Sequence, residues 1–226
     1  MRAIAPSCWR ASTVPRGWRS RRPCIPLHFR RRSAGLAQYP AANEQPGDDK
    51  HMVILLNGPL GIGKSTLAEA LAESLDGAVM LDGDQLIAMT PAPADEVDYL
   101  HGLLALLIGH HRAAGYRHFV ISHLWRTAEE LADLRRRLLV HYPEAEIRCF
   151  LLQLPLDENL RRIERRQSAR ALDEAEFESR TVLAERELLF TAGSESVGEP
   201  FDASASPEEL VAKLLITLGI DGRTEP

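Results

Sequence analysis

MVILLNGPLGIGKST, residues 52–66, joins a short apolar run to a glycine-rich segment. The segment from Gly58 to Ser65 fits the pattern GxxxxGK followed by Ser or Thr at every fixed position. The apolar run Met52–Asn57 is typical of a strand that is buried on both faces of a parallel sheet. After the loop, leucines recur at positions 67, 71 and 75, which predicts an amphipathic helix. The order of strand, glycine-rich loop and helix predicts a loop that binds phosphate.

The spacing within this loop follows from the chemistry of a triphosphate. Its negatively charged oxygens need many donors at short range, and backbone N–H groups supply them where no side chain intrudes. Glycines permit such a tight loop, which delivers the anion to the positive end of a helix. Lys64 is expected to reach the β- and γ-phosphates, and the Ser65 hydroxyl to ligate Mg²⁺. With ATP and Mg²⁺ as ligands, the predicted nucleotide-binding residues of the loop are Gly58, Gly61, Ile62, Gly63, Lys64, Ser65 and Thr66.

A second predicted strand, residues 78–81, ends in Asp82-Gly83-Asp84. Ligands of open parallel sheets bind outside the carboxyl ends of the strands, so these aspartates are expected at the same edge as the loop. One carboxylate can hold the metal or its water, directly or through Ser65, and the other can accept a proton from an attacking hydroxyl or orient it. A tight turn with an aspartate cap is the alternative interpretation.

Further strands and helices alternate along the rest of the chain. Apolar strands that alternate with helices predict an α/β fold with a mostly parallel sheet covered on both faces. The remaining strands are predicted at residues 118–122, 146–154 and 199–202, and the remaining helices at 95–114, 127–141, 156–167, 173–190 and from 206 onward.

The phosphate loop followed by a strand that closes in Asp-x-Asp resembles the P-loop small-molecule kinases. These include shikimate kinase, gluconate kinase, adenylylsulfate kinase and the chloramphenicol phosphotransferase group. The resemblance covers about residues 52–220, although only the loop and the aspartate turn are specific. It implies the three-layer α/β/α sandwich of the P-loop NTPases, with a five-stranded sheet and a helical lid. It also implies that Asp84 contacts the acceptor hydroxyl and that Asp82 assists magnesium.

The third predicted strand runs into Ser122-His-Leu-Trp-Arg126 without an acidic residue. This departs from motor and switch NTPases, which rely on a carboxylate at the end of a later strand. In the small-molecule kinases this edge often touches the acceptor, and Arg126 would match a phosphate or carboxylate of the substrate. The alternative is that Trp125 packs in the core and that His123 is a polar residue with its bonds satisfied. The predicted substrate contacts are Asp84, Ser122, His123, Trp125 and Arg126.

Residues 156–170 form an arginine-rich segment in an otherwise acidic domain. Its position resembles the lid of nucleotide and shikimate kinases, in which cationic side chains stabilise the charge of the transferring phosphoryl group. By this resemblance Arg162 and Arg166 are predicted to be catalytic and Arg170 to bind the nucleotide, in a lid of about residues 160–180. The alternative is a solvated helix whose arginines pair with the acids at positions 157, 158 and 164.

The first fifty residues differ in composition from the rest of the chain. Residues 1–40 contain nine arginines and no acidic residue. A transit peptide, a basic arm and a spurious extension are all consistent with this composition. In each case we expect a disordered extension at residues 1–50, followed by one ATP-binding domain at residues 51–222.

Charge and composition exclude several classes of function. Of 27 basic and 32 acidic residues, 17 and 29 fall in residues 51–226, which gives that part a net charge of −12. A nucleic-acid interface is therefore not expected. No apolar run is long enough for a membrane span, and three scattered cysteines favour a reducing, cytoplasmic location.

These patterns favour an ATP-dependent phosphotransferase that acts on a hydroxyl of a small molecule. An ATP-binding regulatory or switch protein without kinase activity is the alternative, and a kinase for nucleic-acid ends is a third hypothesis. The sequence leaves open the acceptor, the preference for ATP over GTP and the oligomeric state.

Overall fold

The computed structural model describes residues 50–167, 172–191 and 196–220, without the side chains of residues 166–175. Residues 1–49 of the predicted N-terminal extension, Arg170 and the side chain of Arg166 lie outside the described residues. In chain order the elements are β1 (Met52–Asn57), α1 (Lys64–Glu73), β2 (Ala78–Asp82), α2 (Gly83–Leu86), α3 (Glu96–Ala113), β3 (His118–Ser122), α4 (Ala128–His141), β4 (Glu146–Gln153), α5 (Leu156–Gln167), α6 (Leu172–Phe190), β5 (Glu199–Asp202) and α7 (Pro207–Leu218).

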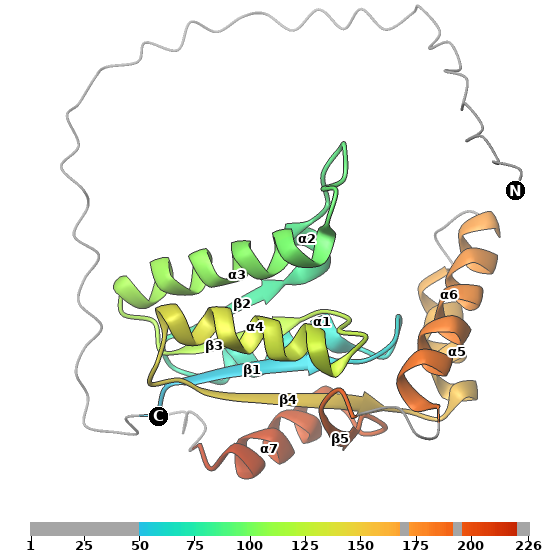
Figure 1. Ribbon diagram of the computed structural model, residues 1–226. Helices are drawn as coiled ribbons and strands as arrows, with labels where there is room; N and C mark the ends of the chain where they lie inside the picture. Colours follow the sequence, from blue (N-terminus) through green and yellow to red (C-terminus); the bar gives the residue numbers. More distant parts are fainter. Residues whose placement is uncertain (1–49, 168–171, 192–195, 221–226) are drawn as a thin grey trace, which may run out of the picture. The chain divides into compact units, whose positions relative to one another are not determined.

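The five strands form one sheet in the order β2-β3-β1-β4-β5, and every pairing is parallel. The prediction of a mostly parallel sheet is therefore confirmed. β1 lies in the centre, and all six of its residues are buried because β3 and β4 pair with it on both sides and helices cover both faces. The carboxyl ends of the strands lie at the end of the sheet where α5 and α6 stand in Figure 1.

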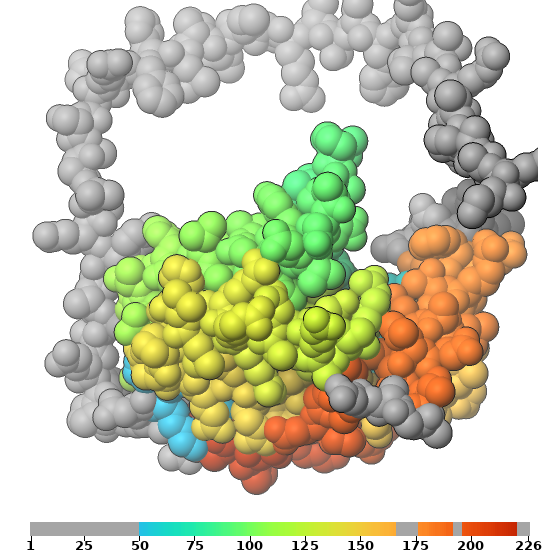
Figure 2. Space-filling view, viewed as in Figure 1, coloured from blue at the N-terminus to red at the C-terminus, as the bar shows by residue number. Residues whose placement is uncertain are grey.

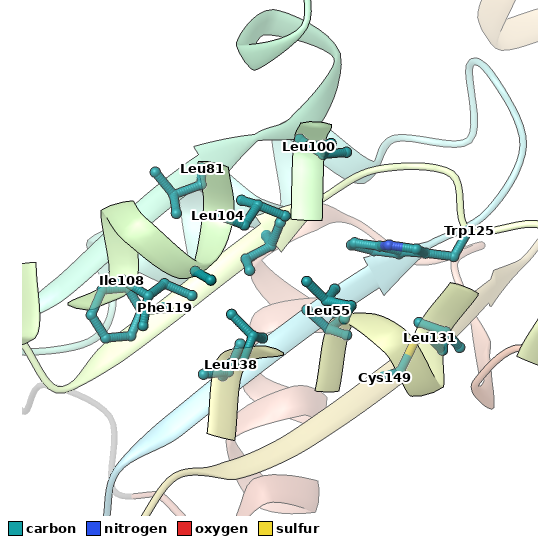
Figure 3. Close-up of a cluster of buried hydrophobic side chains, with 14 of the residues drawn as sticks. Leu55, Leu81, Leu100, Leu104, Ile108, Phe119, Trp125, Leu131, Leu138 and Cys149 are labelled. Atoms are coloured by element: carbon teal, nitrogen blue, oxygen red, sulfur yellow. The ribbon is translucent and has the colours of Figure 1, made fainter. Parts of the chain in front are cut away.

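Helices cover the sheet on both faces, which gives the predicted three layers. α3 and α4 pack on one face with Val53 and Leu55 of β1, in a buried cluster that Figure 3 shows in part. α1 and α7 pack on the opposite face with Ile54 and Leu56. Alternate residues of one strand thus belong to separate cores, as the two-residue repeat of a strand requires.

The helix starts follow their capping residues. Thr127 accepts from the Glu130 amide at 3.1 Å, and the Glu130 carboxylate accepts from the Arg126 amide, so Thr127 and Glu130 do not form a reciprocal capping box. The Asp82–Asp84 segment is more than a tight turn, since Asp82 caps the short helix α2. Ser206 caps α7 with a complete box.

Side chains at the start of the described segment tie it to the domain. The Lys50 ammonium donates to the carbonyls of Leu218 and Gly219 at 3.0 and 2.8 Å, where α7 ends. His51 contacts the hydroxyl of the buried Tyr142 at 2.5 Å. None of the described helices combines the length and the apolar character that crossing a bilayer requires.

Candidate active site

The loop between β1 and α1 has the backbone geometry that its glycines permit. Gly58, Gly61 and Gly63 have φ angles of 150°, 74° and 109°, in the region that disfavours side chains. Gly63 precedes α1, whose first turn contains no acidic residue. The N–H groups at the start of α1 therefore face the loop without a competing carboxylate in the first turn of their own helix.

Asn57 fixes the point where β1 becomes the loop. This side chain is fully buried, and its Nδ2 donates to the carbonyls of Trp125 and Val197 at 2.8 and 3.0 Å. Its Oδ1 accepts from the amides of Gly58 and Trp125 at 2.8 and 3.0 Å. Four hydrogen bonds from one side chain join the ends of β1 and β3 to the segment before β5. Asn57 was not predicted from the sequence, although it is the only polar residue of its apolar strand.

The loop is held from outside by the two helices of the predicted lid. The Leu60 amide donates to Glu185 Oε2 of α6 at 2.6 Å, and the Leu60 carbonyl accepts from Asn159 Nδ2 of α5 at 3.1 Å. A Cβ on Gly61 would lie 2.4 Å from Cγ1 of the buried Ile163. α5 and α6 therefore touch the loop directly. No local sequence pattern indicates the contact of Glu185, because 125 residues separate it from Leu60, whose amide it binds.

The ammonium of Lys64 contacts the loop, and the carboxylate of Asp82 contacts Ser65, the residue after Lys64. The Lys64 ammonium donates to the carbonyls of Gly58 and Pro59 at 2.7 and 3.2 Å, so its charge lies against the loop. Asp82 Oδ2 accepts from the hydroxyls of Ser65 and Ser122 at 2.7 and 3.0 Å.

The pair of Ser65 and Asp82 has the chemistry of a magnesium site. A hydroxyl and a carboxylate are the hard oxygen donors that Mg²⁺ prefers, and Mg²⁺ takes its other ligands from phosphates and water. The described residues contain no group of three or more His, Cys, Asp or Glu that could hold a metal by themselves. The hydroxyl of Ser65 and the carboxylate of Asp82 have the donor chemistry to contact a magnesium ion whose other ligands come from a nucleotide and water.

Asp84 lies in the first turn of α2 and faces His123 at the end of β3. The His123 Nδ1 is 2.8 Å from Asp84 Oδ1. This hydrogen bond holds the pKa of Asp84 below its ordinary value of 3.8, and the charges of His123, Lys64 and Arg126 act in the same direction against the effect of burial. Asp84 is therefore a carboxylate at neutral pH, able to accept a hydrogen bond.

A cavity of about 300 Å³ opens beside Lys64 and Asp84. In Figure 2 a hollow separates the green residues around the α2–α3 connection from the orange α6. Glu96, on α3, and Glu185, on α6, contribute carboxylates to the wall, and neither was identified from the sequence. The cavity is lined by Leu60, Lys64, Asp84, Ile87, Glu96, Val97, His123, Leu124, Arg126 and Glu185.

A second cavity of about 330 Å³ lies on the other side of the loop, between α1, α5 and the segment after β5. Thr66, Leu152 and Leu210 form much of its wall, and Arg162 and Arg165 add two cations. Arg162 donates to the carbonyls of Ile62 and Ala203, each at 2.9 Å. Apolar walls beside a phosphate-binding loop suit the flat face of a nucleobase.

The arginines of α5 differ in whether they face the solvent or the glycine-rich loop. Arg161 pairs with Asp157 and Glu158 on the solvent side, as the solvated-helix alternative supposed. Arg162, one of the predicted catalytic residues, lies at the loop. Arg165 was not selected from the sequence, although it follows Arg162 by three residues and so shares its face of the helix.

The structure separates the four predicted substrate contacts on the β3 edge into two pairs. His123 and Arg126 line the cavity beside Asp84. Ser122 is buried and donates to Asp82 instead. Trp125 is only 1% exposed and packs in the core near Leu55, as Figure 3 shows. Ser122 and Trp125 are not among the residues that line this cavity, and the packing alternative describes the position of Trp125.

Comparisons with known proteins give a family and a fold. The AAA domain family AAA_33 matches residues 53–189, which is more than half of the chain. A search among curated proteins returned no match. Similar solved structures include a tunicamycin resistance protein from Deinococcus radiodurans, with 18% identity, a TM-score of 0.54, and coverage of 78% of this chain and 100% of that chain.

Two kinases also share the fold. A sugar kinase from Janibacter sp. has 20% identity and a TM-score of 0.56, over 75% of this chain and 95% of its own. A gluconokinase from Sinorhizobium meliloti has 19% identity and a TM-score of 0.54, over 74% and 91%. At these identities the similarity concerns the fold.

Proposed function

This chain belongs to the AAA domain family AAA_33, and from that membership and the geometry of the site we propose that it transfers the γ-phosphoryl group of ATP to a hydroxyl of a small molecule. The observation that carries this proposal is the shared cavity of Lys64 and Asp84, a cation that would bind phosphate and a carboxylate that would hold a hydroxyl. The proposal is supported by the fold, which a sugar kinase and a gluconokinase share with this chain.

The nucleotide would lie across the loop between the two cavities. Its base would occupy the cavity that Leu152 and Leu210 line, and its phosphates would run along the loop amides to Lys64. Arg162 and Arg165 face the same cavity, where they would offset the charge of the phosphates. Arg166 and Arg170 remain proposed contacts of the nucleotide.

Mg²⁺, when bound, would neutralise charge on the β- and γ-phosphate oxygens. Ser65 and Asp82 would hold it, and Ser122 would keep the Asp82 carboxylate in place. The hydrogen bond from the Gln85 amide to Asp82 Oδ1, at 3.1 Å, fixes the second carboxylate oxygen. The protein thus orients this carboxylate through three donors before any ligand arrives.

The reaction would proceed by direct transfer within the cavity. The acceptor oxygen forms a bond to the γ-phosphorus while the bond from that phosphorus to the oxygen of the leaving ADP breaks. Asp84 accepts the hydrogen bond of the attacking hydroxyl and takes up its proton as the new bond forms. Because His123 lowers the pKa of Asp84, this carboxylate is a weak base, and its main contribution is to orient the hydroxyl.

Substitution of Lys64 tests the proposal. The wild-type chain should bind Mg-ATP in a calorimetric titration and transfer radioactive phosphate from γ-³²P-labelled ATP to a member of a panel of hydroxylated small molecules. Lys64→Ala should lower transfer by about 100-fold or more, because it removes the cation beside the transferred group. Lys213→Ala, on the exposed side of α7, is the matched control and should leave transfer unchanged.

Two outcomes would contradict the proposal. Full turnover by Lys64→Ala would show that the loop does not hold the reacting phosphate. Tight binding of Mg-ATP by the wild-type chain, with no transfer to any acceptor of the panel, would favour a nucleotide-dependent regulatory protein instead.

A further inference from the structure

Acidic and basic side chains together line the cavity beside Asp84. Its charged or titratable side chains are Lys64, Asp84, Glu96, His123, Arg126 and Glu185. Three of these are carboxylates. How the basic groups are distributed among them decides what charge an acceptor meets.

The basic side chains act on Asp84. His123 Nδ1 lies 2.8 Å from Asp84 Oδ1, and Lys64 and Arg126 line the same cavity as Asp84. Lys64 in addition lies against the phosphate loop. Asp84 is thus surrounded by positive charge before an acceptor enters.

Glu96 and Glu185 have no such compensation. Within the described ranges, no lysine, arginine or histidine forms an ion pair with either carboxylate. Glu185 Oε2 accepts from the Leu60 amide, which leaves its charge in the cavity, and Glu96 lies at the exposed start of α3. A bound triphosphate at the loop would add further negative charge to the same space.

The rest of the wall is apolar. Ile87 directly follows α2, Val97 lies in α3 and Leu124 follows β3, and these three side chains suit the hydrocarbon skeleton of a small molecule. The cavity therefore offers an apolar wall, a carboxylate for a hydroxyl, and two carboxylates without a cation.

The geometry points to an acceptor that carries a protonated amine as well as a hydroxyl, that is, an amino alcohol. This inference rests on the proposed phosphotransferase function. The hydroxyl would meet Asp84, and the ammonium group would pair with Glu96 and Glu185. An anionic acceptor would instead face both of these carboxylates and the triphosphate, and the only basic groups to attract it would be those already beside Asp84. The expectation from the sequence that Arg126 binds an anionic group of the substrate would then not hold.

Three probes of one skeleton test this inference in the full-length chain. They are trans-4-aminocyclohexanol, which is a cation, trans-cyclohexane-1,4-diol, which is neutral, and trans-4-hydroxycyclohexanecarboxylate, which is an anion. Binding is measured by calorimetry at constant ionic strength, in the presence of Mg²⁺ and the non-hydrolysable β,γ-imido analogue of ATP. The amino alcohol should bind about fivefold more tightly than the diol, and the hydroxy acid more weakly than both.

Charge-removing variants identify the carboxylates that are responsible. Glu96→Gln and Glu185→Gln should each reduce the advantage of the amino alcohol, while binding of the diol stays the same. The amide oxygen introduced by Glu185→Gln can still accept from the Leu60 amide, so the loop keeps its contact. Glu129→Gln is the matched control, because Glu129 is an exposed acid in the first turn of α4, as Glu96 is in α3.

The outcomes separate this inference from the proposed function. Preference for the diol or the hydroxy acid, an unchanged ranking in both glutamine variants, or binding of none of the probes would overturn the inference. Phosphorylation of the neutral or anionic probe alone would sustain the phosphotransferase function and reject the amine. Binding of the amino alcohol that depends on Glu96, without phosphate transfer to any hydroxyl, would sustain the cation site and reject the phosphotransferase.

Discussion

The Ser65 hydroxyl lies 2.7 Å from Asp82 Oδ2, which joins the first turn of α1 to the end of β2. β2 and β1 are not neighbours in the sheet, because β3 lies between them, and the Ser122 hydroxyl of β3 donates to the same oxygen at 3.0 Å. One carboxylate oxygen therefore accepts hydrogen bonds from hydroxyls of two other elements. This contact places the proposed magnesium site directly beside the phosphate loop.

We expect Asp82→Asn to weaken the dependence of phosphate transfer on magnesium. Asparagine caps a helix about as well as aspartate, so α2 should keep its start, while the charge that attracts the ion is lost. The Mg²⁺ concentration for half-maximal transfer should rise by about tenfold. A titration of initial rates with MgCl₂ at fixed ATP measures this shift.

Asp95→Asn provides the matched control for Asp82→Asn. Asp95 caps α3 as Asp82 caps α2, but it makes no contact with Ser65. The magnesium dependence of phosphate transfer by Asp95→Asn should equal that of the wild-type chain. An equal rise in both variants would show that the effect comes from helix capping and not from the ion site.

The pH dependence should reflect the contact between Asp84 and His123. The pKa of Asp84 is lowered in the folded state, so its contribution to stability is present above the ordinary value of 3.8 and is lost as the pH falls through the lower folded value. His123→Phe removes the hydrogen bond and should raise the pKa of Asp84. The acid limb of the pH–rate profile should then move to higher pH, and carboxyl ¹³C NMR should report the same direction.

His110→Phe serves as the control for this titration. His110 lies on the exposed side of α3, where its ring contacts His111 and not the active site. The acid limb of this variant should coincide with that of the wild-type chain. If His123→Phe also left the acid limb in place, Asp84 would not be the group that controls it.

Gly83→Ala should impair phosphate transfer without weakening ATP binding. A Cβ at this position would lie 2.8 Å from the Cβ, Cγ and Nδ1 atoms of His123, so His123 or the backbone of α2 must shift, which should disturb the contact between His123 and Asp84. A misplaced group of this kind can lower the rate by about 100-fold. Steady-state kinetics and Mg-ATP calorimetry measure the two effects separately.

Gly102→Ala is the matched helical control for Gly83→Ala. A Cβ on Gly102 would meet its nearest atom, Arg137 Nη1, at 3.9 Å, and alanine favours the helix by about 1 kcal/mol. This variant should be fully active and somewhat more stable. A Gly83→Ala chain that transferred phosphate at the wild-type rate would contradict a role for His123 in orienting Asp84.

Gly61→Ala should lower both thermal stability and ATP affinity. The left-handed backbone at φ 74° disfavours alanine by about 1–2 kcal/mol, and the new Cβ would also lie 2.4 Å from Ile163 Cγ1. The double variant Gly61→Ala with Ile163→Ala relieves the steric overlap and should recover part of the ATP affinity. Calorimetric binding of Mg-ATP and thermal unfolding give both readouts.

Gly77→Ala separates backbone strain from steric overlap. Gly77 has a similar φ of 64°, but a Cβ there would meet nothing closer than 3.9 Å. It should cost less stability than Gly61→Ala and leave ATP affinity unchanged. Equal losses of stability in the two variants would mean that α5 does not press on the loop.

Local physics explains which features the sequence could predict. The strands β1 and β3 coincide with the predicted apolar runs, because a strand covered on both faces needs no polar positions. Thr127 and Ser206 cap helices where expected, since capping depends on residues within one turn. The glycine-rich loop is recognisable for the same reason, because its backbone geometry depends on its own residues.

Contacts between residues that are distant in the sequence could be identified only from the tertiary structure. Glu185 lies 125 positions from the loop amide that it binds, and Asn57 bonds Val197 across 140 positions. No periodicity relates such pairs, because the packing of helices on the sheet decides which side chains meet. The same packing turned Trp125 into the core and left His123 at the cavity.

The sequence by itself determined a parallel α/β fold and a phosphate-binding loop, since both follow from short-range patterns of apolar residues and glycines. Only the tertiary structure decided which arginine of α5 reaches the loop and which carboxylates surround Asp84. A helix presents its residues in every direction, and the direction that faces the site is set by contacts with distant elements.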